Sequence, residues 1–454
     1  MQEKQMENKM GVMPVGKLLA NMAIPMIASM LVQALYNIVD SIYISRVSES
    51  AVTALSLAFP VQNMMIAFSS GVAVGVNSLL SRSLGEKNQR MANKSAGNGI
   101  TLIAIVVVFF MLFGFFGAHP YYAMQSNIEE TVRGGSTYVS IICIFCIGSF
   151  MEILLERLLQ STGRTVYSMI TQSLGAIINI ILDPIFIFGY FGLPAMGVAG
   201  AAVATVIGQC IAASLALYFN IKKNPDIQLV LSDLKLEAEA VWKIVVVGVP
   251  SMVMMAIGSI MNFGMNQILQ GFSETATGVF GIYYKLQSFF FMPIFGLNGA
   301  TISIVAFNYG AKSKERMMKA IKLACCVALS IMLLGLLAFQ VIPEVLLGIF
   351  NPSEEFLAIG VKALRIISIH FPVAAVCIAI GGVFQALGNG VYSTIVSLGR
   401  QLVVLLPAAY LLSLTGDVGM VWWSFVIAEV MSFILSAIFF TKIYNDKIKN
   451  LGIE

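Results

Sequence analysis

Charged residues are scarce in this chain. Only 11% of its 454 residues are Asp, Glu, Lys or Arg, whereas 58% are hydrophobic. Soluble domains carry about 25% charged residues, so the composition excludes an ordinary soluble domain and favours a polytopic membrane protein. The formal net charge is only +4, and no basic patch is present that would bind nucleic acid. The lipid bilayer is therefore the expected partner of most of the surface.

Cysteine and histidine are also rare, with six and two residues. Cys143 and Cys146 form a C-x-x-C pair in an apolar stretch, where free cysteine usually behaves as a small hydrophobic residue. His119 and His370 are too far apart in sequence to indicate a metal site. The chain shows no phosphate-binding loop, zinc spacing or nucleophile constellation. We therefore expect no enzyme, no structural metal, no cofactor and no ATP-driven transport by this chain alone.

What the sequence does contain is twelve long apolar runs, divided six and six by a polar connector. A transmembrane helix needs about 20 predominantly apolar residues, so each run is a candidate span. The polar start lacks the cleavage site of a signal peptide, and the first run is expected to be retained. The predicted organisation is a cytoplasmic N-terminus (1–17), an N-lobe of helices 1–6 (18–221), a cytoplasmic linker (222–242), a C-lobe of helices 7–12 (243–441) and a cytoplasmic tail (442–454).

The basic residues predict the orientation of these spans. If the N-terminus is cytoplasmic, the inner segments hold all 27 Lys and Arg residues except Arg46, Arg133, Lys285, Lys362 and Arg365. Arg400 is counted among the inner residues. Cytoplasmic loops are enriched in Lys and Arg. Both termini are therefore expected in the cytoplasm of a cell whose inner or plasma membrane holds the protein.

The two halves of the chain repeat with a constant offset of 225 residues. Each half has an even number of spans, so both halves enter the membrane from the same side. Parallel repeats of this kind are a transporter architecture, with the binding site near the midplane between the halves. The matching pairs include Pro25 and Pro250, Asn37 and Asn262, Gln62 and Gln287, Gly85 and Gly310, and Gly163 and Gly388.

A polar face lies on the first span. Gln33, Tyr36, Asn37 and Asp40 follow helical i, i+3, i+4, i+7 spacing, so they share one side of the helix. An Asp at the centre of a spanning helix costs roughly 2.5–3.5 kcal/mol on the insertion scale. A carboxylate that a chain keeps at this cost predicts an ion-binding role for Asp40.

A second intramembrane carboxylate, Asp183, lies on span five, with Asn179 one helical turn before it. Asp40 and Asp183 are expected at similar depth because spans one and five run in the same direction. If the two spans are neighbours, both carboxylates, the Asn179 amide and Tyr36 converge in the outer half of the N-lobe. Such a set can hold a proton or a small hard cation such as Na⁺. The alternative is that these groups only join helices by hydrogen bonds worth about 0.6 kcal/mol each.

Four side-chain amides are candidates to line a substrate cavity. Gln33 and Asn37 lie on the first-span face, and Asn262 and Gln287 lie in the second half of the chain. Each amide could instead serve only in helix–helix hydrogen bonding.

Two prolines at equivalent places, Pro25 and Pro250, are candidate hinges. Each removes a backbone hydrogen bond from its helix. Proline is also frequent in ordinary membrane spans, so a tolerated kink is the alternative.

Three further carboxylates have no assigned role. Glu152 and Glu156 lie in span four, and Glu156 is expected to pair with a basic residue near the inner end. Glu429, in span twelve, is a lone carboxylate with no evident partner.

Together these features resemble the multidrug and toxic compound extrusion (MATE) transporters over nearly the whole chain. The resemblance looks closest to the bacterial drug-efflux members of the DinF-like branch. It implies a V-shaped pair of six-helix lobes that exports organic cations against inward H⁺ or Na⁺. The motifs that carry it are Pro25, Gln33-x-x-Tyr36–Asn37-x-x-Asp40, Gln160-x-x-Gly163, Asn179-x-x-x-Asp183–Pro184 and Gln385-x-x-Gly388.

The resemblance also implies roles for single residues. Asp40, Asn179 and Asp183 match the family's N-lobe cation site, where Na⁺ is a possible ligand. Gln33 and Tyr36 match residues that line the N-lobe cavity, and Pro25 matches the proline where the first helix is proposed to bend. Members of the NorM-like branch also carry acidic residues in the C-lobe core. Here the repeat partner of Asp40 is Met265, so a C-lobe cation site is not expected.

The expected function is secondary active multidrug efflux, in which a monomer exchanges hydrophobic organic cations or drugs for H⁺ or Na⁺ by alternating access. The 26 Met and 30 Phe residues suit flat hydrophobic cations of the kind that confer antibiotic resistance when exported. The alternative is a lipid-linked oligosaccharide flippase of the same wider fold. That function needs a basic central cavity for pyrophosphate, and the predicted spans offer almost no Lys or Arg at the midplane.

Overall fold

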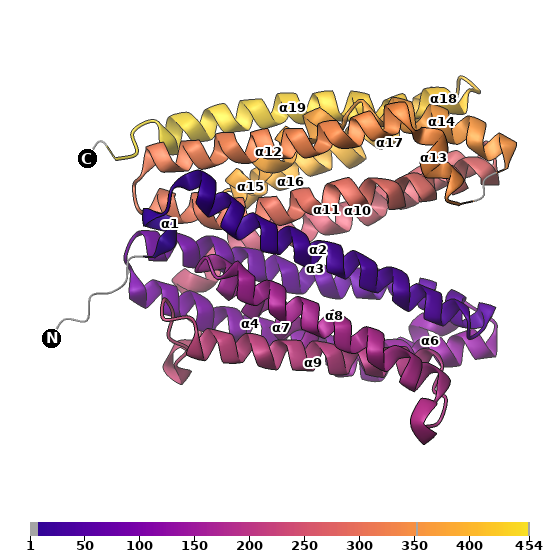
Figure 1. Cartoon of the computed structure of the whole chain (residues 1–454), viewed down its shortest axis with the longest axis horizontal. Helices are drawn as coiled ribbons and strands as arrows, with labels where there is room; N and C mark the ends of the chain where they lie inside the picture. The colour runs from indigo at the N-terminus through magenta and orange to yellow at the C-terminus, as the bar shows by residue number, and fades with distance from the viewer. Residues whose placement is uncertain (1–7, 351–352, 453–454) are drawn as a thin grey trace.

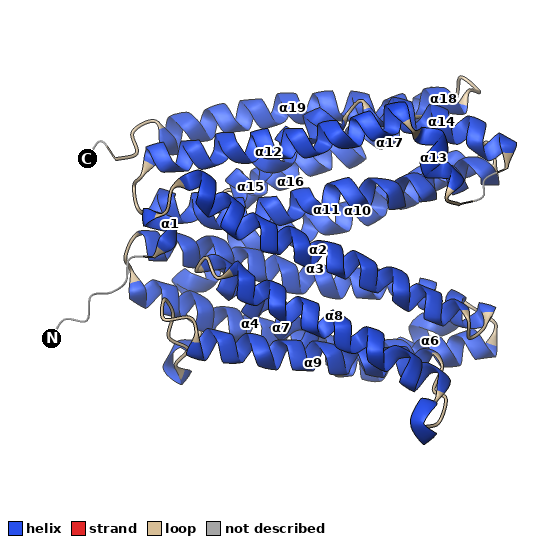
Figure 2. Ribbon diagram, in the orientation of Figure 1, coloured by secondary structure: helices blue, strands red, loops and turns tan. Residues whose placement is uncertain are grey.

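The computed structural model describes residues 8–350 and 353–452, and within these ranges the chain is helical and contains no strand. Two halves lie side by side in a V (Figure 1). They meet at the end of the molecule that holds both chain termini, here named the closed end, and diverge toward the opposite end. Short loops join most of the helices (Figure 2). The all-helical, two-lobed fold predicted from the sequence is confirmed.

The N-lobe begins with a short helix and ends at the connector between the halves. Its helices are α1 (Lys9–Val12), α2 (Val15–Ser45), α3 (Glu49–Gly85), α4 (Gln89–Phe116), α5 (Ala118–Ala123), α6 (Glu129–Ile144), α7 (Ile147–Ser161), α8 (Thr165–Phe188), the 3₁₀ turn η1 (Tyr190–Gly192) and α9 (Val198–Lys222).

The C-lobe repeats this order. A 3₁₀ turn, η2 (Leu231–Leu234), precedes α10 (Ala238–Gln270), α11 (Glu274–Gly310), α12 (Lys314–Val341), α13 (Pro343–Gly348), α14 (Glu354–Ser368), α15 (Phe371–Ala386), α16 (Gly390–Leu398), the π-helix η3 (Gly399–Leu405), α17 (Leu406–Ser413), α18 (Val418–Val421), α19 (Trp423–Ile443) and the π-helix η4 (Tyr444–Ile448).

The described helices include 10 that are long and apolar enough to cross a membrane, or up to 12 if each bent pair is one span. One bent pair, α6 with α7, turns by 47°, and its counterpart, α14 with α15, turns by 49°. The span count of twelve predicted from the apolar runs corresponds to counting each pair once.

The 225-residue repeat extends to backbone detail. The bounds of α3 and α11 differ by 225 at both ends, as do those of α4 and α12. Ser48 caps α3 by accepting a hydrogen bond from Ala51 N at 3.0 Å, and Ser273 caps α11 through Ala276 N at the same distance. Gly163 and Gly388 both take left-handed backbone conformations, with φ of 82° and 76°. Each lobe is therefore built from the same sequence of caps, bends and turns.

The lobes meet through backbone contacts that glycine makes possible. A Cβ atom at Gly85, the last residue of α3, would lie 1.9 Å from the Phe307 carbonyl oxygen of α11. A Cβ atom at Gly310 would lie 2.1 Å from the Arg82 carbonyl oxygen, which is the same contact seen from the other half. Because both oxygens belong to backbone, neither helix could carry a side chain here without moving away from the other lobe.

Each lobe is also held by the segment that leads into the other. Before α2, the Met10 and Met13 carbonyl oxygens accept hydrogen bonds from Arg316 of α12, at 3.0 and 2.7 Å. Before α10, the Leu234 carbonyl oxygen accepts a hydrogen bond from Thr101 of α4 at 2.6 Å. Since α4 and α12 are repeat partners, the two leading segments dock on equivalent helices of opposite lobes.

Replacing Gly85 with Ala should separate the lobes at the closed end, because the added Cβ cannot fit beside the Phe307 carbonyl. Gly134→Ala is the matched control, since nothing lies within 4 Å of a Cβ there. Spin labels at exposed Lys222 and Lys319, in a cysteine-free background, report the distance between lobes. Gly85→Ala should shift the distribution to longer distances, whereas an unchanged distribution would contradict this account of the interface.

Candidate functional site

Three N-lobe helices bring the predicted polar residues together. α8 packs against both α2 and α9. The Asn179 amide of α8 donates to Asp183 Oδ2 at 2.8 Å, in the amide orientation that satisfies its neighbours, and accepts from Thr205 Oγ1 of α9 at 3.1 Å. The Tyr36 hydroxyl of α2 lies 3.5 Å from Thr205 Oγ1. These contacts form one continuous polar network across three helices.

Asp40 belongs to the same region. It interacts electrostatically with Asp183, and Tyr36 interacts with both carboxylates. Asp183 is fully buried, and one oxygen of each carboxylate, Oδ1, is buried without a hydrogen-bond partner among the described residues. A buried carboxylate oxygen without a partner is costly, because its charge is neither hydrated nor paired.

Small residues explain why the network can form. A Cβ atom at Gly208 of α9 would lie 2.8 Å from the Gly175 carbonyl oxygen of α8 and 3.4 Å from Asn179 Cβ. The absence of side chains at this crossing lets the two backbones approach closely. Thr205, one turn before Gly208, can therefore reach the Asn179 amide.

Thr205 is a member of the site that the sequence did not reveal. It lies in a run of alanine, valine and glycine, where a lone Thr is an ordinary packing residue. Its partner lies on another helix, 26 positions away along the chain. Sequence spacing within one helix gives no signal for such a contact.

The network offers oxygen ligands and carries two acids without a basic partner. Carboxylate, hydroxyl and amide oxygens suit a proton or a hard cation. Nowhere in the described chain do three His, Cys, Asp or Glu side chains gather as a transition-metal site. The chemistry that fits is therefore reversible neutralisation of the Asp40 and Asp183 carboxylates.

The other polar candidates of the first two spans differ in the contacts that they make. Gln33 Oε1 accepts a hydrogen bond from Gln172 Nε2 of α8 at 3.1 Å. The side chain of Asn37 lies outside the described part of the chain, so its predicted role is not placed. Gln62 donates to the Tyr138 hydroxyl at 2.9 Å, and Tyr138 interacts electrostatically with Asp40.

The C-lobe amides lie apart from this network. Asn262 donates to the Gly258 carbonyl of its own helix at 3.1 Å, and Gln287 accepts from Tyr283 at 2.7 Å. Met265, at the position equivalent to Asp40, is fully buried in the C-lobe core. The repeat therefore does not extend to the chemistry of the site.

One prediction about a charged residue of the C-lobe is wrong. Arg400, which was counted among the inner residues, lies within the candidate span Gly390–Ser413. Glu429 was expected to lack a partner, yet its Oε2 lies 3.3 Å from Arg400 Nη1, and only 4% of its side chain is exposed. The π-helix η3 contains Arg400 and packs against α19, which carries Glu429. A carboxylate in the C-lobe core is thus paired internally with a guanidinium.

Glu156 also differs from its expected pairing. Its Oε1 accepts a hydrogen bond from Thr171 Oγ1 of α8 at 2.7 Å. Within the described residues it forms no ion pair. The neighbouring Arg157 instead donates to Gln160 Oε1 at 3.0 Å.

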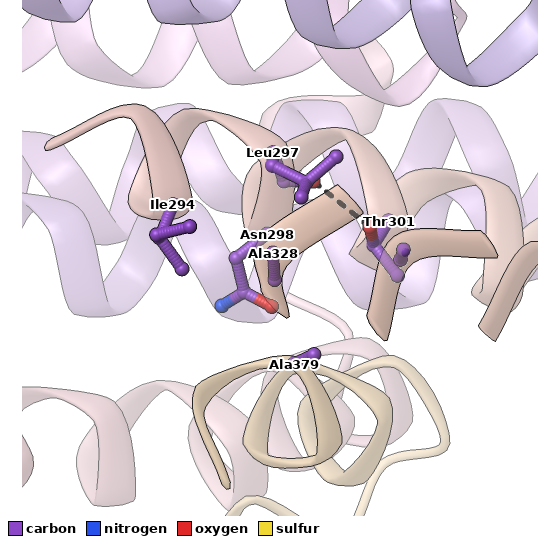
Figure 3. A pocket seen from close by; sticks show the side chains of 7 residues that line it. Ile294, Leu297, Asn298, Thr301, Ala328 and Ala379 are labelled. Carbon is purple, nitrogen blue, oxygen red and sulfur yellow. Dashed lines mark hydrogen bonds between the residues drawn. The ribbon is translucent and has the colours of Figure 1, made fainter. Parts of the chain in front are cut away.

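The C-lobe contains a narrow void between α11, α12 and α15 (Figure 3). Small and apolar side chains form most of its wall, and Asn298 points into it. A larger cavity of about 750 Å³ opens at the far end of the N-lobe. Its lining includes Glu129, Glu130 and Arg133 of α6 and the start of α9.

Both halves of the chain match one family model, that of the MatE family, over residues 25–185 and 250–411. The multidrug export protein MepA of Staphylococcus saprophyticus is 25% identical over 423 residues, covering 92% of this chain and 91% of that protein. A protein named FAD transporter from Shewanella oneidensis is 24% identical over 402 residues and covers 88% of each chain.

Solved structures share the fold. The outward-facing conformation of a multidrug resistance MATE family transporter superposes with a TM-score of 0.90 at 24% identity over the whole of both chains. A MOP superfamily transporter from Pyrococcus furiosus gives the same score and identity over 99% of both chains. Because the family model covers more than half of the sequence, this chain belongs to the MatE family, and it is a multi-pass membrane transporter rather than an enzyme.

Proposed function

We propose that the protein exports hydrophobic organic cations in exchange for inward H⁺ or Na⁺ by alternating access. The observation that carries this proposal is the pair of N-lobe carboxylates, Asp40 and Asp183, each with a buried oxygen that has no hydrogen-bond partner in the part of the chain that the structure describes. Such a pair requires neutralisation. A proton, Na⁺ or an organic cation can each supply it, so their binding is mutually exclusive.

Competition for one pair of carboxylates gives a coupling mechanism. When H⁺ or Na⁺ neutralises the site from outside, the attraction for an organic cation disappears and the drug is released. When the ion leaves on the inner side, the carboxylates regain their charge and can attract the next cation. Tyr36, Asn179 and Thr205 hold the geometry, and Gln33 is proposed to contribute to the N-lobe cavity.

Membership of the DinF-like branch fits the distribution of acids. Apart from Glu239 and Glu274 in their first turns, α10 and α11 contain no carboxylate. The Glu429 carboxylate of the C-lobe already has Arg400 as a counter-ion. Ion coupling is therefore assigned to the N-lobe alone, and the C-lobe amides Asn262 and Gln287 are proposed to contact substrate.

An anionic substrate, such as a lipid-linked oligosaccharide, is the second candidate. Arg400 favours it because a guanidinium lies within a candidate span, and one relative is named an FAD transporter. Pairing with Glu429 leaves the two residues with no net charge, however, while the N-lobe carboxylates carry no basic partner. The distribution of charge between the two lobes therefore favours organic cations over anions as substrates.

Pro25 and Pro250 are proposed hinges. Proline removes the hydrogen bond to the carbonyl four residues earlier, and for Pro25 that acceptor, Asn21 O, instead accepts from Thr165 Oγ1 of α8 at 3.3 Å. At Pro250, the Thr394 hydroxyl of α16 donates to the proline's own carbonyl at 2.7 Å. At Pro25 a side chain on a neighbouring helix thus replaces the missing donor, whereas at Pro250 it binds a carbonyl that the proline does not free. Such contacts between helices can be exchanged during a bend.

The protein is proposed to act as a monomer in the plasma or inner membrane, with its closed end in the cytoplasm. Cysteines at Met124, which is 86% exposed between α5 and α6, and at Lys223, which follows α9, test the orientation. In a cysteine-free background on intact cells, a membrane-impermeant maleimide should label position 124 and reach position 223 only after lysis. Labelling of position 223 on intact cells, and of position 124 only after lysis, would place the closed end outside the cell.

Pro25→Ala should fold and insert normally, because the restored N–H can bond with Asn21 O, but it should slow drug efflux several-fold by stiffening α2. Pro60→Ala is the matched control, since Pro60 lies inside α3 and is not a proposed hinge. Drug efflux from proteoliposomes is measured for both variants. Equal rates for Pro25→Ala and the wild type would show that the kink is only tolerated.

Asp40→Asn and Asp183→Asn keep the shape of the side chain and remove its charge. Each should insert normally and lower gradient-driven dye efflux by about tenfold or more, the range of a typical coupling free energy. The double variant should be little worse than either single one, because the two acids act as a unit.

Met265→Leu is the control at the equivalent C-lobe position and should keep most of the activity, since it conserves volume. Proteoliposomes with separately imposed pH and Na⁺ gradients identify the coupling ion. Near wild-type gradient-driven efflux by Asp40→Asn, or equal damage from Met265→Leu, would refute an N-lobe coupling site.

A further inference from the structure

A buried polar stripe runs along α8 from its beginning to the carboxylate site. Ser168, Thr171, Gly175, Asn179 and Asp183 follow one another at helical spacing, and all are buried. The stripe begins at the closed end, where α8 starts, and reaches the coupling site at Asp183. No membrane helix needs such a stripe for insertion, because each polar group lowers its affinity for lipid.

α7 places polar side chains opposite this stripe in antiparallel register. Gln160 donates to Ser168 Oγ at 2.8 Å, and Thr171 donates to Glu156 Oε1 at 2.7 Å. One turn further, Glu152 faces Gly175, where a Cβ atom would lie 3.5 Å from Glu152 Oε1. The contacts between α7 and α8 therefore lead stepwise from the closed end toward Asn179.

Glu152 connects this series with the carboxylate site. It interacts electrostatically with Tyr36 on one side and with Glu156 on the other. Tyr36 in turn interacts with Asp40 and Asp183.

The other titratable groups that face the pair are few. Cys210 of α9 faces Glu152, and Arg157 interacts with Glu156. Neither carboxylate forms an ion pair within the part of the chain that the structure describes. Glu152 and Glu156 are thus acids placed between two ends of a polar path.

Simple helix–helix association does not account for this pair. An amide or hydroxyl would supply the same hydrogen bond to Thr171 at lower cost than a carboxylate in the membrane. At the positions related by the repeat, the C-lobe has Cys377 and Gly381. The C-lobe, whose buried carboxylate Glu429 is paired with Arg400, thus has no acid at either of these two positions.

We propose that Glu152 and Glu156 relay protons between the Asp40–Asp183 site and the cytoplasmic end of the N-lobe. The inference rests on the proposed function and adds to it the route by which the coupling proton leaves. In each step one O–H bond breaks on a carboxylic acid and one forms on the next carboxylate. The proton leaves the Asp40–Asp183 site beside Tyr36, passes to Glu152 and then to Glu156, and is finally released to water at the cytoplasmic end. Every carboxylate regains its starting charge.

Glu152→Gln and Glu156→Gln test the relay, because glutamine keeps the shape and hydrogen-bonding capacity but cannot carry the proton. Efflux driven by an imposed pH gradient should fall about tenfold or more. Exchange of labelled for unlabelled dye across the membrane without a gradient needs no net proton transfer, so it should stay near the wild-type rate.

Conservative variants separate the proposed role from folding. Glu152→Asp and Glu156→Asp keep a transferable proton and should restore part of the pH-driven efflux that the Gln variants lose. Cys377→Ala, at the C-lobe position equivalent to Glu152, is the matched control and should leave both activities unchanged. If a Gln variant fails to insert, the Asp variants take its place in the test. They should transport faster than Thr171→Val if these positions require a carboxylate and not only good packing.

Three results would overturn the relay. Wild-type pH-driven efflux in the Glu152→Gln, Glu156→Gln double variant would show that the acids carry no proton. Equal loss of efflux and exchange would assign them a structural role. Efflux of the wild-type protein driven by Na⁺ but not by a pH gradient would refute the relay and leave ion-coupled export intact. If Asp40→Asn keeps full gradient-driven activity, the proposed export mechanism itself fails. That outcome differs from a failure of the relay alone.

Discussion

The free-energy cost of an unpaired carboxylate inside a membrane is the constraint on which the N-lobe depends. Asp40 and Asp183 interact electrostatically, and within the described residues neither forms an ion pair and each has a buried oxygen without a hydrogen-bond partner. Burial of a charge is tolerated only where a counter-charge or a proton compensates it. In the proposed mechanism a cation supplies this compensation at the site that α2, α8 and α9 form.

The C-lobe meets the same constraint in a different way. Its intramembrane acid, Glu429, has a permanent partner in Arg400, which the π-helical turn of η3 carries toward α19. A permanently compensated acid has no need of an external cation. Two lobes with matching helices, caps and bends thus differ in whether their buried charge is balanced from within or from outside. This difference gives the transport cycle a chemical polarity that the backbone symmetry alone lacks.

The sequence was informative wherever one helix contains the whole signal. Spacing within α8 placed Asn179 and Asp183 on one face, and a single offset predicted the repeated architecture. It was uninformative wherever the signal is a contact between helices. Thr205 enters the site only because Gly175 and Gly208 let α8 and α9 approach. The pairing of Arg400 with Glu429 depends on packing between η3 and α19, which no charge count along the chain can express.

The crossed docking of the two leading segments bears on how such a chain can arise. The segment before α2 binds α12, and the segment before α10 binds α4, and these two helices are related by the internal repeat. A protein of half this length could close around an identical copy by exchanging these segments in a two-fold symmetric pair. Duplication and fusion of its gene would preserve every contact of that exchange. The halves could then diverge within one polypeptide, one keeping acids without a basic partner and the other gaining an internal counter-ion.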